Sequence, residues 1–241
     1  MSKFQFGIII PSYQDHRILT TIKSILDIDK TSKTKIYVSD GGSSEILQNN
    51  IKKVLREHDY LITEKDKGIF DALNKGLNKV EEEYIGWLGS DDIYADDFSF
   101  EELEKLFSPN IDAVVYDTDF VSSGKVRRVS RARNLRMIRL GFHNPHFSTF
   151  LRKSSVGVMR FDLKYNNLAD IFFFIKFFAT PSIKIVSIRK VACIMSLGGV
   201  SNRHNFQIIK NNLQIFKILF NEKGFIFAFS FTFNKLLSKF I

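Results

Sequence analysis

The feature that most constrains the fold is a regular alternation of short apolar runs and amphipathic stretches through residues 1–120. The runs are typical of buried strands, and the stretches between them carry apolar residues at helical spacing. The pattern predicts helices over 16–28, after Ser43 or Ser44, and over 69–80, and strands over 6–10 (ended by Pro11), 35–40, 60–63, 84–88 and 111–117. Strands that alternate with helices in this way form a mainly parallel sheet flanked by helices. We therefore predict an α/β fold.

Polar residues follow each of these strands, at the edge of the sheet where α/β proteins bind their ligands. After the first strand, Pro11 is followed by Tyr13 and Asp15. Asp40 follows the second strand, Asp66 the third, and Asp91 and Asp92 the fourth. Each cluster alone could be an ordinary turn. Carboxylates that recur at one edge, however, repel one another unless a cation or hydrogen-bond donors lie between them. No dinucleotide or P-loop fingerprint competes with this interpretation.

The charge is divided unevenly between the two halves of the chain. Residues 1–120 carry 14 Lys/Arg and 23 Asp/Glu, whereas residues 121–241 carry 21 Lys/Arg and three acids. An acidic half followed by a basic half predicts a protein that handles a metal and anionic ligands, or one that lies on an anionic surface. Nucleic-acid binding would also account for the basic half.

Cysteine content and hydropathy limit the cellular setting. Cys193 is the one cysteine, so a disulfide framework is excluded. The N-terminus lacks the pattern of a signal peptide, and the longest apolar stretch, residues 224–233, is about half as long as a membrane span. We therefore expect neither a secreted nor a polytopic membrane protein.

The order of several short motifs resembles that of the family 2 glycosyltransferases, which have the GT-A fold. The matching strings are IIIPSY, VSDGGSS, EKDKGIFDALNKG, WLGSDDIY, NPHFSTFLRK, RFDLKYNNLADIFFFIKF and LGGVSN, within roughly residues 4–202. The most similar subgroup adds single sugars to bacterial surface-polysaccharide precursors, using a nucleotide-diphosphate sugar and inverting the anomeric centre. The resemblance implies a GT-A domain over 1–204 and a tail over 205–241. Within that domain, residues 1–120 would bind the nucleotide sugar and residues 121–204 the acceptor.

Asp91 and Asp92 are the predicted metal-binding residues. A sugar-nucleotide donor carries two phosphates, and its leaving group gains charge during transfer, so a hard divalent cation held by carboxylates would neutralise that charge. Oxygen ligands favour Mg²⁺ or Mn²⁺ over Zn²⁺. The resemblance places both residues in the family's acidic motif, with Asp92 as the direct ligand. A capped turn is the alternative.

The resemblance also predicts the rest of the donor site. Asp40 would bind the base or ribose, Tyr13 would stack on the base, and Pro11 and Asp15 would flank it. Asp71, Asn74 and Lys75 lie on the helix that borders the donor in this family, with Lys75 near the phosphates. Because Asp71 and Lys75 are four residues apart on a helix, a local ion pair is the alternative interpretation.

Asp170 is the predicted catalytic base. An inverting transfer is one displacement, so one carboxylate must accept the proton of the acceptor hydroxyl. Asp162 and Asp170 are the two aspartates of the second half, and Asp170 matches the position of the family's base. The surrounding pattern is looser than in the family, with Ala169 before it and Lys176 as the next basic residue. A helix N-cap is the alternative role for Asp170.

Three further residues are predicted to bind the acceptor or a phosphate. His146 aligns with a family histidine, although a buried structural histidine is the alternative. Arg203 and His204 lie in a segment that closes over the pyrophosphate in many relatives.

The second half ends in two unusual stretches. Residues 125–139 are rich in Arg and contain no acid, which is typical of a segment that binds a diphosphate or an anionic leaflet. Residues 205–241 combine phenylalanines with spaced lysines, the composition of a helix lying in a membrane interface. A terminal helix pair packed on the core is the alternative. The tail predicts a cytoplasmic protein held peripherally on the inner face of the cell membrane.

Together these patterns predict an inverting, metal-dependent enzyme that moves a sugar from a UDP-sugar to a lipid-diphosphate-linked saccharide in surface-polysaccharide biosynthesis. Two alternatives are a basic nucleic-acid-binding protein and a nucleotidyltransferase. The first leaves the acids at the strand ends unexplained, so we expect no nucleic-acid partner. The second usually needs a Gly-rich basic loop after the first strand, which PSYQD does not supply.

Overall fold

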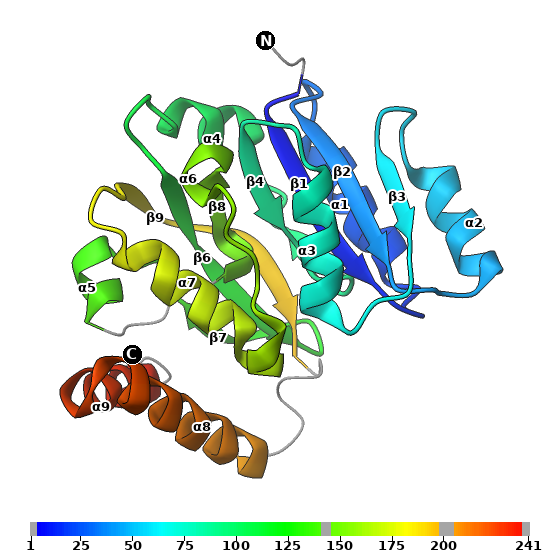
Figure 1. The fold of residues 1–241 in the computed structure, drawn as a ribbon. Helices are drawn as coiled ribbons and strands as arrows, with labels where there is room; N and C mark the ends of the chain where they lie inside the picture. The colour runs from blue at the N-terminus through cyan, green and yellow to red at the C-terminus, as the bar shows by residue number, and fades with distance from the viewer. Residues whose placement is uncertain (1–3, 141–145, 198–204, 238–241) are drawn as a thin grey trace.

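One mixed sheet organises the protein (Figure 1), seen here in a computed structural model that describes residues 4–140, 146–197 and 205–237. The order of its strands is β3-β2-β1-β4-β8-β6-β9-β5, and β7 pairs with β6 outside this path. The strands are β1 (Phe6–Ser12), β2 (Thr34–Asp40), β3 (Tyr60–Thr63), β4 (Tyr84–Trp87), β5 (Ile93–Tyr94), β6 (Ala113–Ser122), β7 (Lys125–Ser130), β8 (Thr149–Arg152) and β9 (Ile185–Ser196).

The first half of the sheet is parallel, as the alternating pattern predicts. β1 pairs with β2 and β4, and β2 pairs with β3, all in parallel register. The connecting helices are α1 (Ile18–Ile28), α2 (Glu45–Val54) and α3 (Ile69–Lys79). Ser44 caps α2 by accepting a hydrogen bond from the backbone N–H of Leu47. α3 packs in front of the sheet and α1 behind it, so the two helices cover opposite faces (Figure 1).

The second half of the sheet mixes directions. β8 is antiparallel to both β4 and β6, whereas β9 is parallel to β6. The remaining elements are α4 (Phe100–Leu106), α5 (Leu135–Arg139), the 3₁₀ turn η1 (His146–Ser148), α6 (Lys153–Val156), the 3₁₀ segment η2 (Leu163–Leu168) and α7 (Ala169–Ala179). α7 lies across the same face as α3 (Figure 1).

The prediction that β1 ends at Pro11 is wrong by two residues. The strand continues to Ser12, with Pro11 opposite Ser39 of β2. β4 pairs only with Phe6–Ile9, so β1 has a neighbour on one side at Pro11. A proline is tolerated where a strand lies at an edge, because no partner there needs its missing N–H.

The chain ends in a pair of helices, α8 (Asn205–Lys223) and α9 (Phe225–Leu237), which pack on α7. They form a second, smaller hydrophobic core, separate from the main core of the sheet and its helices. Within the described residues, no helix is both long and apolar enough to cross a membrane. The tail therefore packs on the protein through one face, as the alternative interpretation of its sequence predicted.

Candidate functional site

The loops after β1 and β2 meet at the carboxyl edge of the sheet. Ser43 Oγ accepts a hydrogen bond of 2.8 Å from the backbone N–H of Gln14. Asp40 is 1% exposed, and its carboxylate accepts bonds from the backbone N–H of Ser43 and the side chain of Gln48. Asp40 therefore organises the β2–α2 turn. Tyr13 is 65% exposed beside this turn, which leaves its ring free to stack on a ligand.

Asp15 and Asp91 share one cation, Arg17. The guanidinium of Arg17 contacts both oxygens of Asp15, at 2.9 and 2.8 Å, and its Nη1 lies 3.1 Å from Asp91 Oδ2. Ser90 Oγ donates a further bond of 3.1 Å to Asp15. Burial disfavours the charged form of Asp15, but the bonds from Arg17 and Ser90 outweigh it and lower its pKa. These contacts join the β1 and β4 loops through charges of opposite sign.

Asp92 is held in a buried turn next to Asp91. Its Oδ1 accepts a bond of 3.1 Å from the backbone N–H of Ser196, and Thr21 Oγ1 donates to its carbonyl at 2.7 Å. Burial, followed by the charge of Asp91, raises the pKa of Asp92 to about 7. A Cβ on Gly89 would overlap Asp92 Oδ2, so a larger residue there would have to displace this carboxylate. The turn thus places two like charges together, an arrangement that a bound cation relieves.

The donor set is suited to a cation that also binds the substrate. Within the described ranges, no group of three or more His, Cys, Asp or Glu side chains could hold a metal ion. Mg²⁺ in proteins is commonly bound by one or two carboxylates together with substrate phosphates and water. Asp91 and Asp92 meet that requirement and would leave the other positions of the ion to a diphosphate.

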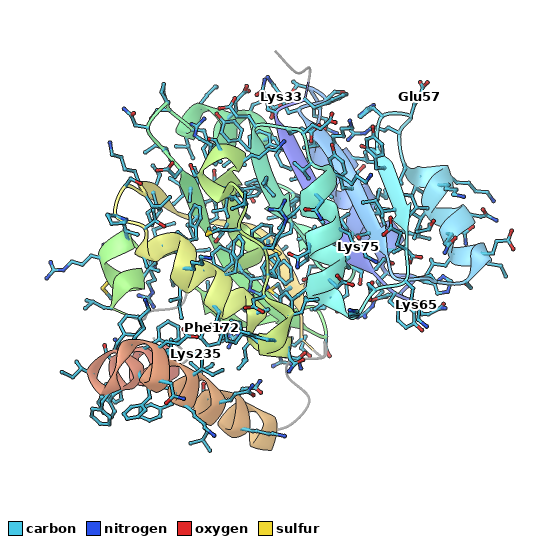
Figure 2. All side chains as sticks on the ribbon, viewed as in Figure 1. Lys33, Glu57, Lys65, Lys75, Phe172 and Lys235 are labelled. Carbon is cyan, nitrogen blue, oxygen red and sulfur yellow. The ribbon has the colours of Figure 1, made fainter. Side chains whose placement is uncertain are left out.

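Asn74 and Lys75 of α3 have structural partners. Both atoms of the Asn74 amide bond the backbone of Phe161, at 2.8 Å each. Lys75 Nζ donates to the carbonyls of Glu64 and Lys65, which closes the loop after β3 (Figure 2). Asp71 accepts a bond from the backbone N–H of Lys67. The four-residue spacing suggested an ion pair between Asp71 and Lys75, but each side chain instead binds the loop after β3. Their predicted contacts with the donor stay predictions.

Asp170 and His146 face each other on the acceptor side. Asp170 Oδ2 lies 3.5 Å from His146 Nδ1, and the aspartate side chain is 13% exposed. In the described parts of the chain, Asp170 Oδ1 is buried without a hydrogen-bond partner. Burial lowers the pKa of His146, against the opposing effect of the Asp170 charge, so the imidazole is neutral at neutral pH. A buried carboxylate oxygen that lacks a donor is costly, which is the condition expected of a group that awaits a substrate hydroxyl.

The helix-cap role for Asp170 is wrong. The N-cap of α7 is Leu168, without a side-chain cap bond, and Asp170 lies inside the first turn. Asp162 does cap a helix: it accepts a bond from the Lys164 backbone at the start of η2 and pairs with the Lys164 ammonium at 2.8 Å. Of the two aspartates considered as the base, only Asp170 therefore has an unpaired oxygen.

Comparison with known proteins gives the family. The sequence pattern of the family described as "Glycosyl transferase family 2" matches residues 7–165, about two thirds of the chain. The chain belongs to the family 2 glycosyltransferases. A relative named "PGL/p-HBAD biosynthesis glycosyltransferase" from Mycobacterium tuberculosis is 23% identical over 207 residues, which cover 84% of this chain and 81% of the relative. The protein is thus a glycosyltransferase.

Solved structures of other glycosyltransferases have the same GT-A architecture. S. aureus TarS, residues 1–349, is similar with a TM-score of 0.67 and 16% identity over 95% of this chain and 70% of that one. A mannosyltransferase from Pyrobaculum calidifontis, solved with GDP-Man and Mn²⁺, has a TM-score of 0.66 and 14% identity over 96% and 70%. The predicted fold class is confirmed, including the helical tail.

Within this glycosyltransferase, Trp87 connects the donor loop to the acceptor side. Trp87 ends β4, four residues before Asp91, and its Nε1 donates to the His146 carbonyl at 2.9 Å. Its ring packs against Phe173 and Phe174 of α7. The helix that carries Asp170, α7, therefore packs against β4, the strand that leads to Asp91 and Asp92.

Sequence reasoning missed the residues that hold the acidic turn. Arg17 bridges Asp15 and Asp91, whereas Thr21 and Ser196 bind the Asp91–Asp92 backbone from α1 and β9. The basic charge of Arg17 beside the first loop was a signal that could have found it. Thr21 and Ser196 gave no such signal, since both interact through common hydrogen bonds over long sequence distances.

The basic segment 125–139 is partly balanced, contrary to the impression from its composition. Buried Asp117 of β6 pairs with Arg131 at 2.8 Å and lies 3.8 Å from Arg189. Arg128 lies over the ring of Phe120, 3.9 Å from its centroid. Arg203 and His204 lie outside the described residues, and their predicted roles stay predictions.

Proposed function

We propose that this glycosyltransferase moves a sugar from a UDP-sugar to a lipid-diphosphate-linked saccharide, with inversion of the anomeric centre, in surface-polysaccharide biosynthesis. The observation that carries the proposal is the unpaired, buried oxygen of Asp170 on a helix packed against the strand of the acidic motif. Solved neighbours support a nucleotide-sugar donor, since TarS was crystallised with UDP-GlcNAc and the mannosyltransferase with GDP-Man.

The chemistry follows from the two sides of the site. The hydroxyl of the acceptor attacks the anomeric carbon while Asp170 accepts its proton, and the bond from that carbon to the diphosphate oxygen breaks. The nucleoside diphosphate leaves with the bonding electrons. When bound, Mn²⁺ or Mg²⁺ at Asp91 and Asp92 would neutralise the charge on this leaving group. His146, whose Nδ1 lies 3.5 Å from Asp170 Oδ2, can orient this carboxylate.

A donor and acceptor screen tests this proposal. UDP-sugars and GDP-Man are incubated with a synthetic polyprenyl-diphosphate-linked saccharide and Mn²⁺, Mg²⁺ or EDTA. We expect transfer from one UDP-sugar with either ion, none in EDTA, and a product of inverted anomeric configuration by NMR. Full activity in EDTA or a retained configuration would contradict the mechanism. Transfer from GDP-Man, or only to an acceptor without a diphosphate, would correct the substrates.

We propose further that the protein works at the inner surface of the cell membrane. α9 exposes Phe225, Phe229 and Phe233, whose stacked rings lie 6.0 and 5.9 Å apart, and Ile226 beside them is 85% exposed. Glu222 is the one acid in the tail sequence, among spaced lysines. Exposed aromatic residues with surrounding positive charge suit an anionic lipid surface.

Vesicle co-sedimentation tests the lipid proposal. The protein should sediment with vesicles that contain phosphatidylglycerol, bind phosphatidylcholine vesicles weakly, and be released by high salt. Phe225→Ala/Phe229→Ala/Phe233→Ala should stay in the supernatant. Equal sedimentation of this variant and the parent would contradict a role for the exposed face of α9.

A further inference from the structure

We propose that the α8–α9 pair is a positioning element for the catalytic side of the site, holding both the helix of Asp170 and the end of α5 at Leu140. The proposal rests on the proposed role of Asp170 as the base. It assigns to the tail a second role, independent of lipid, which is carried by the face opposite to the exposed phenylalanines.

The first contact is the smaller hydrophobic core. Leu168 and Ile171 come directly before and after the Ala169–Asp170 pair, and Phe172 follows them. All three are buried against the tail, and Figure 2 shows Phe172 between α7 and the tail helices. The tail contributes Ile215, Leu219, Ala228 and Phe231. Meanwhile Phe173, Phe174 and Phe177 of α7 belong to the main core. α7 is therefore fixed from two sides, by two different cores.

The second contact holds the segment that enters α7. The hydroxyl of Tyr165 donates to Glu222 Oε1 at 2.8 Å, and its ring stacks on Phe172 with centroids 4.0 Å apart. Asn166, the next residue, has φ 48° and ψ −126°, a sparsely populated backbone conformation for a residue with a side chain. Such a conformation persists only where its surroundings hold it. Here the single acid of the tail binds directly beside it.

The third contact reaches the other member of the catalytic pair. Ser230 Oγ and Asn234 Nδ2 of α9 donate to the carbonyl of Leu140, at 3.1 and 2.6 Å. Leu140 follows α5 and lies six residues before His146. The tail thus contacts the segment that enters α7 beside Asp170 and the end of α5, six residues before the His146 that lies 3.5 Å from Asp170. The donor turn takes its support from Thr21 of α1 and Ser196 of β9.

Phe231→Ala tests the proposal, because Phe231 is 4% exposed in the smaller core. Leu213→Ala, at a position of α8 that is 65% exposed, is the matched control in the tail, and Phe231→Leu is the conservative rescue. We measure kcat with a short-chain soluble acceptor, the Kd of the donor with Mn²⁺ by calorimetry, and the His146 titration by NMR. A misplacement of about 1 Å can cost on the order of 10²-fold in rate.

We expect Phe231→Ala to lower kcat about 10- to 100-fold and to change the donor Kd less than twofold. The His146 pKa should rise toward its ordinary value as the imidazole loses burial. Leu213→Ala should match the parent in all three, and Phe231→Leu should restore most of the rate. A Phe231→Ala protein with a lower melting temperature but parental kcat and His146 titration would overturn the proposal.

Two further outcomes are distinguishable. If Phe231→Ala does not fold, Tyr165→Phe removes the hydroxyl that binds Glu222 and must show a smaller change of the same kind, or the proposal fails. If no donor is turned over by the parent, the proposed function fails, while the His146 titration still shows whether the tail positions this pair.

Discussion

Asp92 and Asp170 are both mostly buried aspartates, but the two regions that hold them differ. Asp92 lies in a turn where it accepts hydrogen bonds from a backbone N–H and a threonine hydroxyl. Arg17 adds a positive charge near Asp91 and Asp92. Asp170 lies on a helix where one oxygen has histidine at 3.5 Å and the other, among the described residues, has no partner. The donor-side carboxylate is therefore fixed by hydrogen bonds beside a like charge, whereas the acceptor-side carboxylate keeps an oxygen without a partner among the described residues.

This difference teaches how the protein divides its work. A binding carboxylate can be fixed firmly because its task is to hold a charge in one place. A base needs a free lone pair at the moment the substrate hydroxyl arrives, so its helix must be held by packing instead of by bonds to the carboxylate. α7 shows this division, with its phenylalanines in two cores.

The largest expected effect comes from removing the donor-side charge. Asp92→Ala should lose metal-dependent donor binding and turnover together, with kcat/KM lower by roughly 10³-fold, because a bound ion contributes several kcal/mol of charge stabilisation. Exposed Asp96→Ala is the control in the next loop. If Asp92→Ala lowered kcat alone and kept the donor Kd, the two regions would not be divided as described.

The raised pKa of Asp92 predicts a pH dependence of metal-free stability. The folded state binds this proton up to about pH 7, whereas the unfolded chain releases it near pH 4. Hence the free energy of unfolding in EDTA should fall as pH rises from 4 to 7, by a few kcal/mol at most. Asp92→Asn should lack this component, so it should be more stable than the parent at pH 8 and not at pH 4. If urea denaturation gave the same difference in free energy of unfolding between Asp92→Asn and the parent at pH 4 and pH 8, the prediction would be contradicted.

The smallest expected effect concerns Arg17, which already provides a positive charge at the acidic loop. Arg17→Gln should tighten Mn²⁺ binding about fivefold in the absence of donor, because an exposed ion pair contributes up to about 1 kcal/mol that the ion must otherwise displace. Calorimetry measures the Kd, with Lys23→Gln on the exposed face of α1 as the charge-matched control. Equal tightening in both variants would assign the effect to net charge alone.

The sequence predicts the parallel half of the fold well because its strands are local patterns. The strands over 34–40 and 60–63 differ from the predicted strands by one residue at most. Each is a mainly apolar run, and Gly41 follows the first and Glu64 the second. The strands β7, β8 and β9 escaped prediction. In β9, Arg189 and Lys190 interrupt the apolar pattern, and its partner β6 lies some seventy residues earlier. Pairing over such distances depends on packing that no local pattern records.

The sequence predicted which residues form the candidate site better than it predicted the partners of their side chains. Asp91, Asp92 and Asp170 stand at the ends of elements that the pattern identifies. The amide of Asn74, predicted at the donor, instead binds the backbone of Phe161. Its neighbour lies 87 positions away, so only the folded chain could show that this amide joins the donor half to the segment before α7.

The most direct test of the account compares Asp170→Asn with Asp162→Asn. Asp170→Asn keeps the shape of the side chain but removes the proton acceptor, whereas Asp162 is an exposed cap paired with Lys164. We predict that Asp170→Asn binds donor and Mn²⁺ like the parent yet loses transfer by roughly 10²- to 10⁴-fold, while Asp162→Asn keeps most of its rate. Parental turnover in Asp170→Asn, or a larger loss in Asp162→Asn, would contradict the central claim that Asp170 is the base.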